Sequence, residues 1–214
     1  ILIGELNEGY IKAIRGAYDI PIVCVDYYDV YEDVDYIITD GFGGMEQMTR
    51  LLLDQGFSDL MFVGTPDGTK NITDRYLGYC KALELAGLEE AQRNILPDRD
   101  FSNGDYRIQF ELPDKLPEAF VCNCDKTAEI LLQKLKARGI RVPEDVSVVG
   151  FDNYNTRNLA PIKLTTYEND EKAIAQISVN TLLKRIEGRK RVSGVRIVGG
   201  SIVHGNTVRQ KGDL

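Results

Sequence analysis

A run of β-branched apolar residues that stops abruptly at polar ones constrains the fold of this chain most. Residues 146–149 read Val-Ser-Val-Val, and Gly-Phe-Asp-Asn follows at 150–153. Such a run is typical of a strand buried in a parallel sheet. Open α/β sheets bind their ligands at the carboxyl ends of such strands. The stretch therefore predicts an α/β fold, and it makes Asp152 a candidate ligand contact.

The same design recurs at two other places in the chain. Residues 21–25 end at Asp26, and residues 119–122 are followed by the stretch Asn123–Asp125. We expect the three strands to deliver their aspartates to one edge of a sheet, where they would form a site for a polar small molecule.

Strand and helix patterns alternate along the chain, which is typical of parallel strands joined by right-handed crossovers. Asp74 is expected to cap a helix over 75–86, which leaves 65–73 as a loop. The other expected helices cover 8–17, 44–55, 106–111, 125–138 and 170–187, and the other expected strands cover 1–4, 20–26, 35–39, 60–64, 94–101 and 195–203.

The charge balance argues against a general nucleic-acid-binding surface. The formal net charge is −7 and the pI is about 4.9, whereas nucleic-acid-binding domains are usually basic. Hydrophobic residues make up 43% of the 214, which is enough for a packed core. No apolar run approaches the length of a membrane span. The four cysteines are expected to be buried, reduced thiols of a cytoplasmic protein.

Arg75 stands out because it is expected to open a helix, where a cation opposes the helix dipole. One interpretation is a guanidinium group that is aimed at the oxygens of a ligand. The alternatives are an ion pair with Asp74 and a solvated arginine.

Asp26, Asp125 and Asp152 each follow an expected strand. Ionised carboxylates accept hydrogen bonds from sugar hydroxyl groups, but a strand-end aspartate can instead cap the next helix. Capping is favoured for Asp125, which precedes an expected helix, and ligand binding is favoured for Asp152. No calcium-binding loop and no histidine cluster accompanies them, so no metal is expected.

Two aromatic residues are candidates for stacking on the apolar face of a sugar ring. Phe101 lies at the end of the strand expected over 94–101, and Tyr27 follows Asp26. The alternative for each is an ordinary aromatic residue of the core or its rim, and the sequence alone favours that alternative.

Motifs for other functions are incomplete. The stretch 41–44 reads Gly-Phe-Gly-Gly, but Glu46 stands where a dinucleotide-binding fingerprint needs glycine. The single histidine, His204, supports no Ser-His-Asp site. The basic run over 184–196 lacks interleaved aromatic residues and is interpreted as a solvated helix end. We therefore expect no cofactor and assign no catalytic residue.

Nearly the whole chain resembles the effector-binding core of the lactose-repressor/galactose-repressor family of bacterial transcription regulators. The resemblance lies in the order and spacing of four stretches. They are Arg75-Tyr76-Leu77-Gly78-Tyr79 with Ala82-Leu83, the stretch 117–123, the stretch 139–153, and Leu164-Thr165-Thr166.

The resemblance implies two Rossmann-like lobes of the periplasmic-binding-protein-like type I fold. One lobe would comprise 1–38 and 170–200, and the other 39–169 and 201–214. It also implies a sugar or related metabolite bound between the lobes, a homodimer, and operator DNA bound through a helix-turn-helix head that this sequence lacks. The first lobe is expected to be incomplete at its N-terminus.

The resemblance also implies roles for individual residues. Asp26 would bind the ligand from the first lobe, and Arg75, Cys124 and Asp152 from the second. Phe101 would be the stacking platform. Asn71, on the loop expected before Arg75, would contact the ligand, and dimerisation would involve the helix that starts at Asp125 and the segment 152–162.

The sequence departs from the family at individual positions. Cys124 stands where a polar amide or acid is more usual, Phe57 where histidine is usual, and His204 where arginine is usual. We expect a regulator and not an enzyme. The main alternative is the solute-binding protein of a sugar transporter, which would share the fold.

Overall fold

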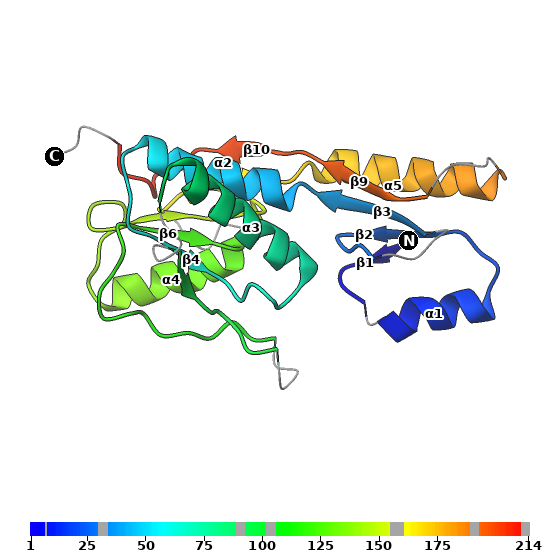
Figure 1. Cartoon of the computed structure of the whole chain (residues 1–214), viewed down its shortest axis with the longest axis horizontal. Helices are drawn as coiled ribbons and strands as arrows, with labels where there is room; N and C mark the ends of the chain where they lie inside the picture. The colour runs from blue at the N-terminus through cyan, green and yellow to red at the C-terminus, as the bar shows by residue number, and fades with distance from the viewer. Residues whose placement is uncertain are drawn as a thin grey trace. The chain divides into compact units, whose positions relative to one another are not determined.

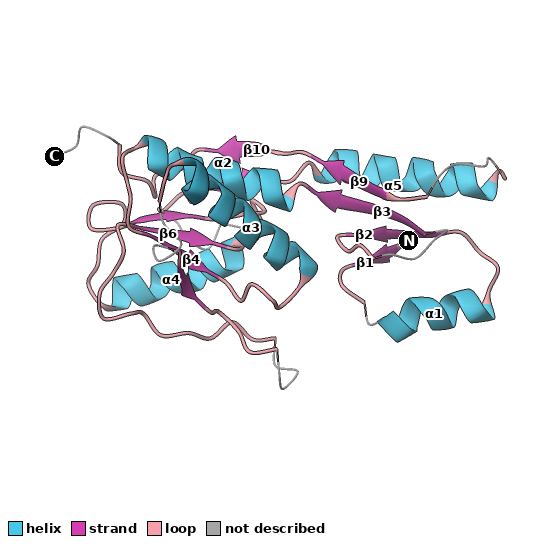
Figure 2. Ribbon diagram, viewed as in Figure 1, coloured by secondary structure: helices cyan, strands magenta, loops and turns pink. Residues whose placement is uncertain are grey.

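The computed structural model describes residues 1–6, 8–29, 34–88, 93–101, 106–154, 161–188 and 193–210. The chain forms two compact units. Unit 1 comprises Ile1–Asp40 and Asn169–Gly200, and unit 2 comprises Gly41–Glu168 and Ser201–Leu214. Parallel sheets with flanking helices make up both units, so the predicted α/β fold is confirmed (Figure 1; Figure 2).

Unit 1 is built on a parallel sheet with the strand order β1-β2-β3-β9. The helix α5 packs against β2 and β3, and its N-cap Asp170 accepts a hydrogen bond from the backbone N–H of Ala173 at 2.8 Å. The elements of this unit are β1 (Leu2–Ile3), α1 (Glu8–Ala17), β2 (Ile22–Val25), β3 (Val34–Thr39), α5 (Glu171–Ile186) and β9 (Val195–Val198).

Unit 2 is built on a second parallel sheet with the order β5-β4-β6-β7, next to an antiparallel pair of β8 and β10. Its strands are β4 (Leu60–Val63), β5 (Asn94–Leu96), β6 (Ala119–Cys122), β7 (Ser147–Val149), β8 (Thr166–Glu168) and β10 (Ser201–Val203). Its helices are α2 (Gly41–Asp54), α3 (Lys70–Leu85) and α4 (Asp125–Ala137). Among the described residues, no helix is long and apolar enough to cross a membrane.

Glycines allow α2 to pack closely within unit 2. A Cβ atom on Gly78 would lie 2.2 Å from the carbonyl oxygen of Phe42 in α2. A Cβ atom on Gly44 would lie 2.8 Å from the ring of Tyr167 in β8. Since neither distance leaves room for a side chain, these glycines serve helix packing, which agrees with the rejection of a dinucleotide-binding loop.

The predicted start of α3 is wrong. The helix begins at Lys70 because the hydroxyl oxygen of Thr69 caps it, accepting a hydrogen bond from the backbone N–H of Ile72 at 3.2 Å. The hydroxyl group of Thr73 donates to the carbonyl oxygen of Thr69 at 3.0 Å. The polar residues over 69–73, which the sequence patterns place in a loop, thus satisfy the first turn of the helix.

This correction changes three residue assignments. Asp74 lies inside α3 and does not cap it, and Asn71 lies on the helix rather than on a loop. Arg75 lies in the second turn, so its charge is not placed at a helix start. The helix α2 likewise begins at Gly41 rather than at Gly44.

The helix predicted over 106–111 is absent, and the segment has no regular secondary structure. Ile108, Phe110 and Leu112 alternate with exposed residues and pack into the core of unit 2, which is the periodicity of an extended chain. The strand predicted over 94–101 ends at Leu96.

The basic run over 184–196 has a structural role that the sequence did not predict. Arg185 donates to Asp35 at 2.9 Å and Arg196 donates to it at 3.1 Å, and Asp35 is fully buried. These two cations neutralise a core carboxylate, so the interpretation as a solvated helix end is wrong for them. The residues 189–192 lie outside the described part of the chain.

Candidate functional site

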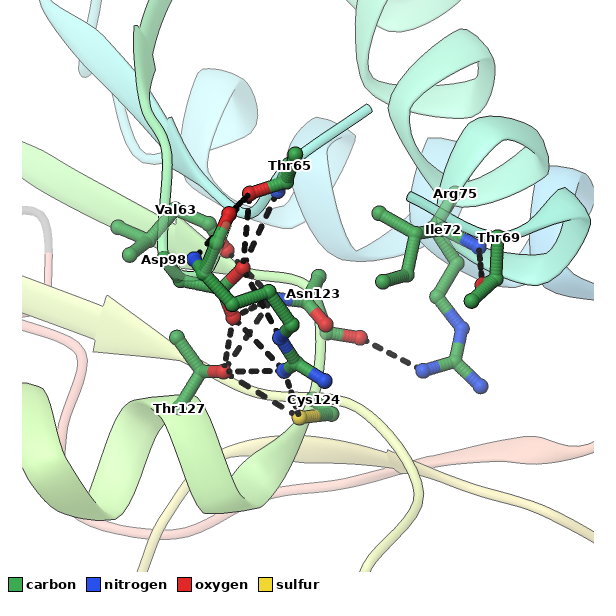
Figure 3. A network of polar contacts seen from close by, with 10 residues as sticks. Val63, Thr65, Thr69, Ile72, Arg75, Asp98, Asn123, Cys124 and Thr127 are labelled. Atoms are coloured by element: carbon green, nitrogen blue, oxygen red, sulfur yellow. Dashed lines mark hydrogen bonds and ion pairs between the residues drawn. The ribbon is translucent and has the colours of Figure 1, made fainter. Parts of the chain in front are cut away.

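Polar residues gather at the carboxyl edge of the unit 2 sheet. Thr65 follows β4, Asp98 follows β5, Asn123 follows β6 and Asp152 follows β7. Because the four strands are parallel, their carboxyl ends lie at the same edge, where open α/β sheets bind ligands. Figure 3 shows Thr65, Asp98 and Asn123 of this cluster, with Asn123 between Asp98 and Arg75.

Asp98 is the centre of the cluster, and it is fully buried. Its Oδ1 accepts hydrogen bonds from the backbone N–H of Thr65 at 3.1 Å and from Nε of Arg99 at 3.2 Å. Its Oδ2 accepts from Arg99 Nη2 at 2.8 Å, Asn123 Nδ2 at 2.8 Å and Thr127 Oγ1 at 2.7 Å. The carboxylate therefore ties together residues that follow β4, β5 and β6.

The protonation of Asp98 follows from these contacts. Burial alone would raise the pKa of its carboxyl group. The hydrogen bonds from Arg99, Thr127 and Asn123, together with the charge of Arg99, lower that pKa below its usual range. The pKa of Arg99 is raised in turn, because its bonds to Asp98 outweigh its burial. The two groups form a buried ion pair at neutral pH.

Arg75 reaches the same edge from α3. Its Nη1 donates to the carbonyl oxygen of Asn123 at 2.7 Å, and its Nη2 donates to Oδ1 of Asp152 at 2.9 Å. The guanidinium group lies 4.2 Å from the centre of the Phe151 ring. Its Nε is buried and has no hydrogen-bond partner among the described residues. The ion pair of Arg75 is therefore with Asp152 and not with Asp74, which was one of the alternatives.

Asp152 is held in a strained turn. Its φ is 102° and that of Asn153 is 52°, values that side-chain-bearing residues rarely adopt. The turn is anchored by the hydrogen bond from the backbone N–H of Asp152 to the carbonyl oxygen of Tyr167 at 2.8 Å, and by the bond from Asn153 Nδ2 to Glu168 at 2.8 Å. Such strain is common where a side chain is aimed at a ligand.

Asp125 does not cap α4, contrary to the interpretation favoured by the sequence. Cys124 occupies the N-cap position, and Asp125 is the first helical residue. Its buried carboxylate accepts from Thr166 Oγ1 at 2.6 Å and from the backbone N–H of Tyr154 at 2.8 Å. Burial, opposed by the Thr166 bond and reinforced by the charge of Asp152, raises its pKa to about 7. Asp125 thus fastens the Asp152 turn to α4 and β8.

The structure places the other predicted residues of unit 2 around this edge. Cys124 is partly buried, and its Sγ lies 3.9 Å from Arg99 Nη2 and 3.4 Å from Thr127 Oγ1. Phe101 is partly buried and packs against the core and against Tyr106. Asn71 is on the first turn of α3.

Asp26 and Tyr27 belong to unit 1, so the expectation that Asp26, Asp125 and Asp152 share one sheet edge is wrong. Asp26 is exposed at the carboxyl end of β2, with a φ of 60°. Tyr27 is buried in the core of unit 1, and its hydroxyl group donates to Asp29 at 2.6 Å. The arrangement of Tyr27 is that of a core aromatic residue.

Sequence patterns missed Asp98, Arg99, Asn123 and Thr127 as members of the site. The assignment of 94–101 to one strand hid the signal, because it placed Asp98 inside a strand rather than after one. Among the described residues, no group of histidine, cysteine and acidic side chains is arranged to hold a metal ion.

The structure shows where two of the residues that depart from the family pattern lie. Phe57 is buried in the core, with the guanidinium group of Arg209 at 5.4 Å from its ring centre. His204 is exposed just after β10.

Among curated proteins, the HTH-type transcriptional repressor PurR of Glaesserella parasuis serovar 5 (strain SH0165) is 29% identical over 189 residues, which cover 87% of this chain and 55% of that protein. The chain spans about half the length of such curated relatives. These relatives bear the same repressor name.

Solved structures share the fold. A LacI family transcriptional regulator from Enterococcus faecium with bound ribose has a TM-score of 0.82 at 24% identity, covering 94% of this chain and 76% of that one. The complex of the transcriptional regulator CelR with cellobiose has a TM-score of 0.78 at 21% identity, covering 96% of this chain and 64% of that one.

A family match covers most of the chain, from residue 49 to residue 208. Together with the repressor relatives, it confirms the resemblance that the sequence stretches predict. The chain belongs to the family of periplasmic binding protein-like domains.

Proposed function

We propose that this chain is the effector-binding domain of a bacterial DNA-binding transcriptional regulator, and that its effector is a sugar or a related metabolite. The observation that carries the proposal is the Arg75–Asp152 pair at the carboxyl edge of the unit 2 sheet. The repressor relatives and the ribose and cellobiose complexes of similar folds support it.

The pair suits a polyhydroxylated ligand. Each terminal nitrogen of Arg75 carries two N–H groups, and the bonds to Asn123 and Asp152 use one of each. The remaining N–H groups can donate to ligand oxygens, while the partly exposed carboxylate of Asp152 accepts from ligand hydroxyl groups. The unsatisfied Nε of Arg75 fits a site that is completed by another molecule.

Further contacts are part of the proposal. Asp26 would contact the ligand from unit 1, Phe101 would stack on it, and Asn71 and Cys124 would line the site. Tyr27 and Asp125 are weaker candidates, because both are buried and have intramolecular partners. The lobe boundaries at 1–38 with 170–200, and 39–169 with 201–214, belong to the proposal as well.

The proposed mechanism is a population shift. A ligand that binds one arrangement of the lobes more tightly than another favours that arrangement, by no more than its difference in affinity. In the complete regulator, a homodimer in the cytoplasm would transmit this change to operator DNA through a helix-turn-helix head. The repressor names of the relatives favour a regulator over a transport protein, and a binding protein over an enzyme.

The experiment is a thermal-shift screen of sugars against the full-length protein, followed by a DNA mobility-shift assay with each sugar that stabilises it. We expect at least one sugar to raise the melting temperature and to change operator binding. Stabilisation without any change in operator binding would contradict the regulatory role, and chemical turnover of the sugar would contradict the binding role.

A further inference from the structure

Arg99 places a second guanidinium group at the carboxyl edge of the unit 2 sheet. Its side chain is 16% exposed, and the fully buried Asp98 holds it through both Nε and Nη2. Nη2 also contacts Thr127 Oγ1 at 3.3 Å and Cys124 Sγ at 3.9 Å. A guanidinium group that is fixed in this way needs little reorganisation to bind a ligand.

The remaining terminal nitrogen of Arg99 is available. Among the described residues, Nη1 of Arg99 has no hydrogen-bond partner. Some polar atoms that lack a partner are buried, but Nη1 is not one of them. The carboxylate that neutralises Arg99 lies behind it, with no exposed surface and with further donors from Thr65, Asn123 and Thr127. A molecule that approaches from solvent therefore meets the N–H groups of Arg99 and not Asp98.

The two arginines flank the same stretch of backbone. Arg75 donates to the carbonyl oxygen of Asn123, and Arg99 contacts the side chain of the next residue, Cys124. The Cys124 sulfur is a weak acceptor, and the hydroxyl group of Thr127 donates to Asp98. The edge beyond β6 thus presents mainly hydrogen-bond donors, and the group that fits there is an acceptor.

We propose that Arg99 determines the specificity of the effector site by binding an anionic oxygen of the ligand, so that the effector is an acidic sugar derivative bearing a carboxylate or a phosphate. This inference rests on the proposed function. The two N–H groups of Nη1 can donate to such a group, and charge-assisted hydrogen bonds are roughly twice as strong as neutral ones.

The first experiment compares matched neutral and acidic sugars on the full-length protein. The pairs are glucose with glucuronate, glucose with glucose 6-phosphate, and ribose with ribose 5-phosphate, and their dissociation constants are measured by calorimetry. We expect an acidic member to bind about tenfold or more tightly than its neutral partner. The carboxylate and phosphate pairs distinguish the two sources of the charge.

Variants assign the preference to Arg99. Arg99→Gln should remove the tenfold preference, and Arg99→Lys should restore part of it, because lysine keeps the charge without the planar fork. Arg141→Gln, in an exposed ion pair with Asp145, is the control and should leave the preference unchanged. Circular dichroism identifies any variant that fails to fold, and the wild-type comparison does not depend on the variants.

Inorganic phosphate supplies a test without a sugar. At equal ionic strength, potassium phosphate should raise the melting temperature of the wild type more than potassium chloride does, and the difference should vanish in Arg99→Gln. Three results would each overturn the inference: equal affinity for neutral and acidic sugars, a preference that survives in Arg99→Gln, or no stabilisation by phosphate or any acidic sugar.

These results separate this inference from the proposed function. A neutral sugar that binds and alters operator binding would leave the proposed function intact while it refutes the role of Arg99. Phosphate binding that depends on Arg99, without any effect of sugars on operator binding, would refute the proposed function while it leaves Arg99 as an anion-binding residue.

Discussion

Replacing Asp98 by asparagine tests whether the buried network organises the edge of the unit 2 sheet. The change removes the charge that neutralises Arg99 and turns an amide N–H₂ group toward donors from Asn123 and Thr127. Removing one partner of a buried ion pair destabilises a protein by about 3–5 kcal/mol. Because whole domains are stable by only about 5–15 kcal/mol, this variant should leave unit 2 close to unfolding.

The assay is urea unfolding at neutral pH, followed by circular dichroism, with hydrogen exchange of the β4 and β6 amides to locate the loss in unit 2. The control is Glu84→Gln, which breaks an exposed ion pair with Lys81 and should change stability by less than about 1 kcal/mol. An effect of Asp98→Asn as small as that of the control would show that the buried network does not organise this edge of the sheet.

The pH dependence of the same experiment has a definite sign. The pKa of Asp98 is lowered in the folded protein, so its contribution is complete above the ordinary range of an aspartate. That contribution is lost as the pH falls through the lowered pKa. The difference between wild type and Asp98→Asn should therefore shrink in acid, and a difference that grows in acid would be inconsistent with the network.

Three further predictions concern binding, pH and assembly. Arg75→Ala and Asp152→Ala should each abolish ligand-induced thermal stabilisation without unfolding the protein. The control Arg50→Ala, which breaks an exposed pair with Glu46, should keep this stabilisation. Unchanged stabilisation in the first two variants would contradict the assignment of the ligand site to Arg75 and Asp152. Because the pKa of Asp125 is raised to about 7, its contribution to stability is lost as the pH rises from about 4 to 7. The stability of wild type relative to Asp125→Asn should therefore fall by at most about 1.4 kcal/mol per pH unit in urea unfolding. A difference that stays constant between pH 5 and 8 would contradict the raised pKa. Light scattering of the full-length protein should give a dimer, and a monomer at working concentrations would contradict the proposed assembly.

Sequence patterns predicted the parts of the fold that depend on local periodicity. The helix that begins at Asp125 is strongly periodic, and the buried run before Asp152 is continuous and ends at polar residues, so both lie where they were expected. The start of α3 was misplaced because Thr69 and Thr73 satisfy backbone groups of the first turn, whereas the same residue types often form loops.

Relations between distant segments were not accessible from the sequence. Asp26 and Asp152 follow similar apolar runs, yet their strands belong to different sheets, and strand order is not encoded in local pattern. Arg75 pairs with Asp152, which lies far along the chain, rather than with the adjacent Asp74. Asp98 was missed because the predicted strand ran from residue 94 to residue 101, whereas β5 ends at Leu96 and leaves Asp98 after the strand.

A crystal structure of the protein with an effector found by the sugar screen tests whether the ligand binds at the Arg75–Asp152 pair. We expect ligand oxygens within hydrogen-bond distance of Arg75 and Asp152, at the carboxyl ends of β6 and β7. A ligand bound elsewhere, with the Arg75–Asp152 pair intact and untouched, would contradict it.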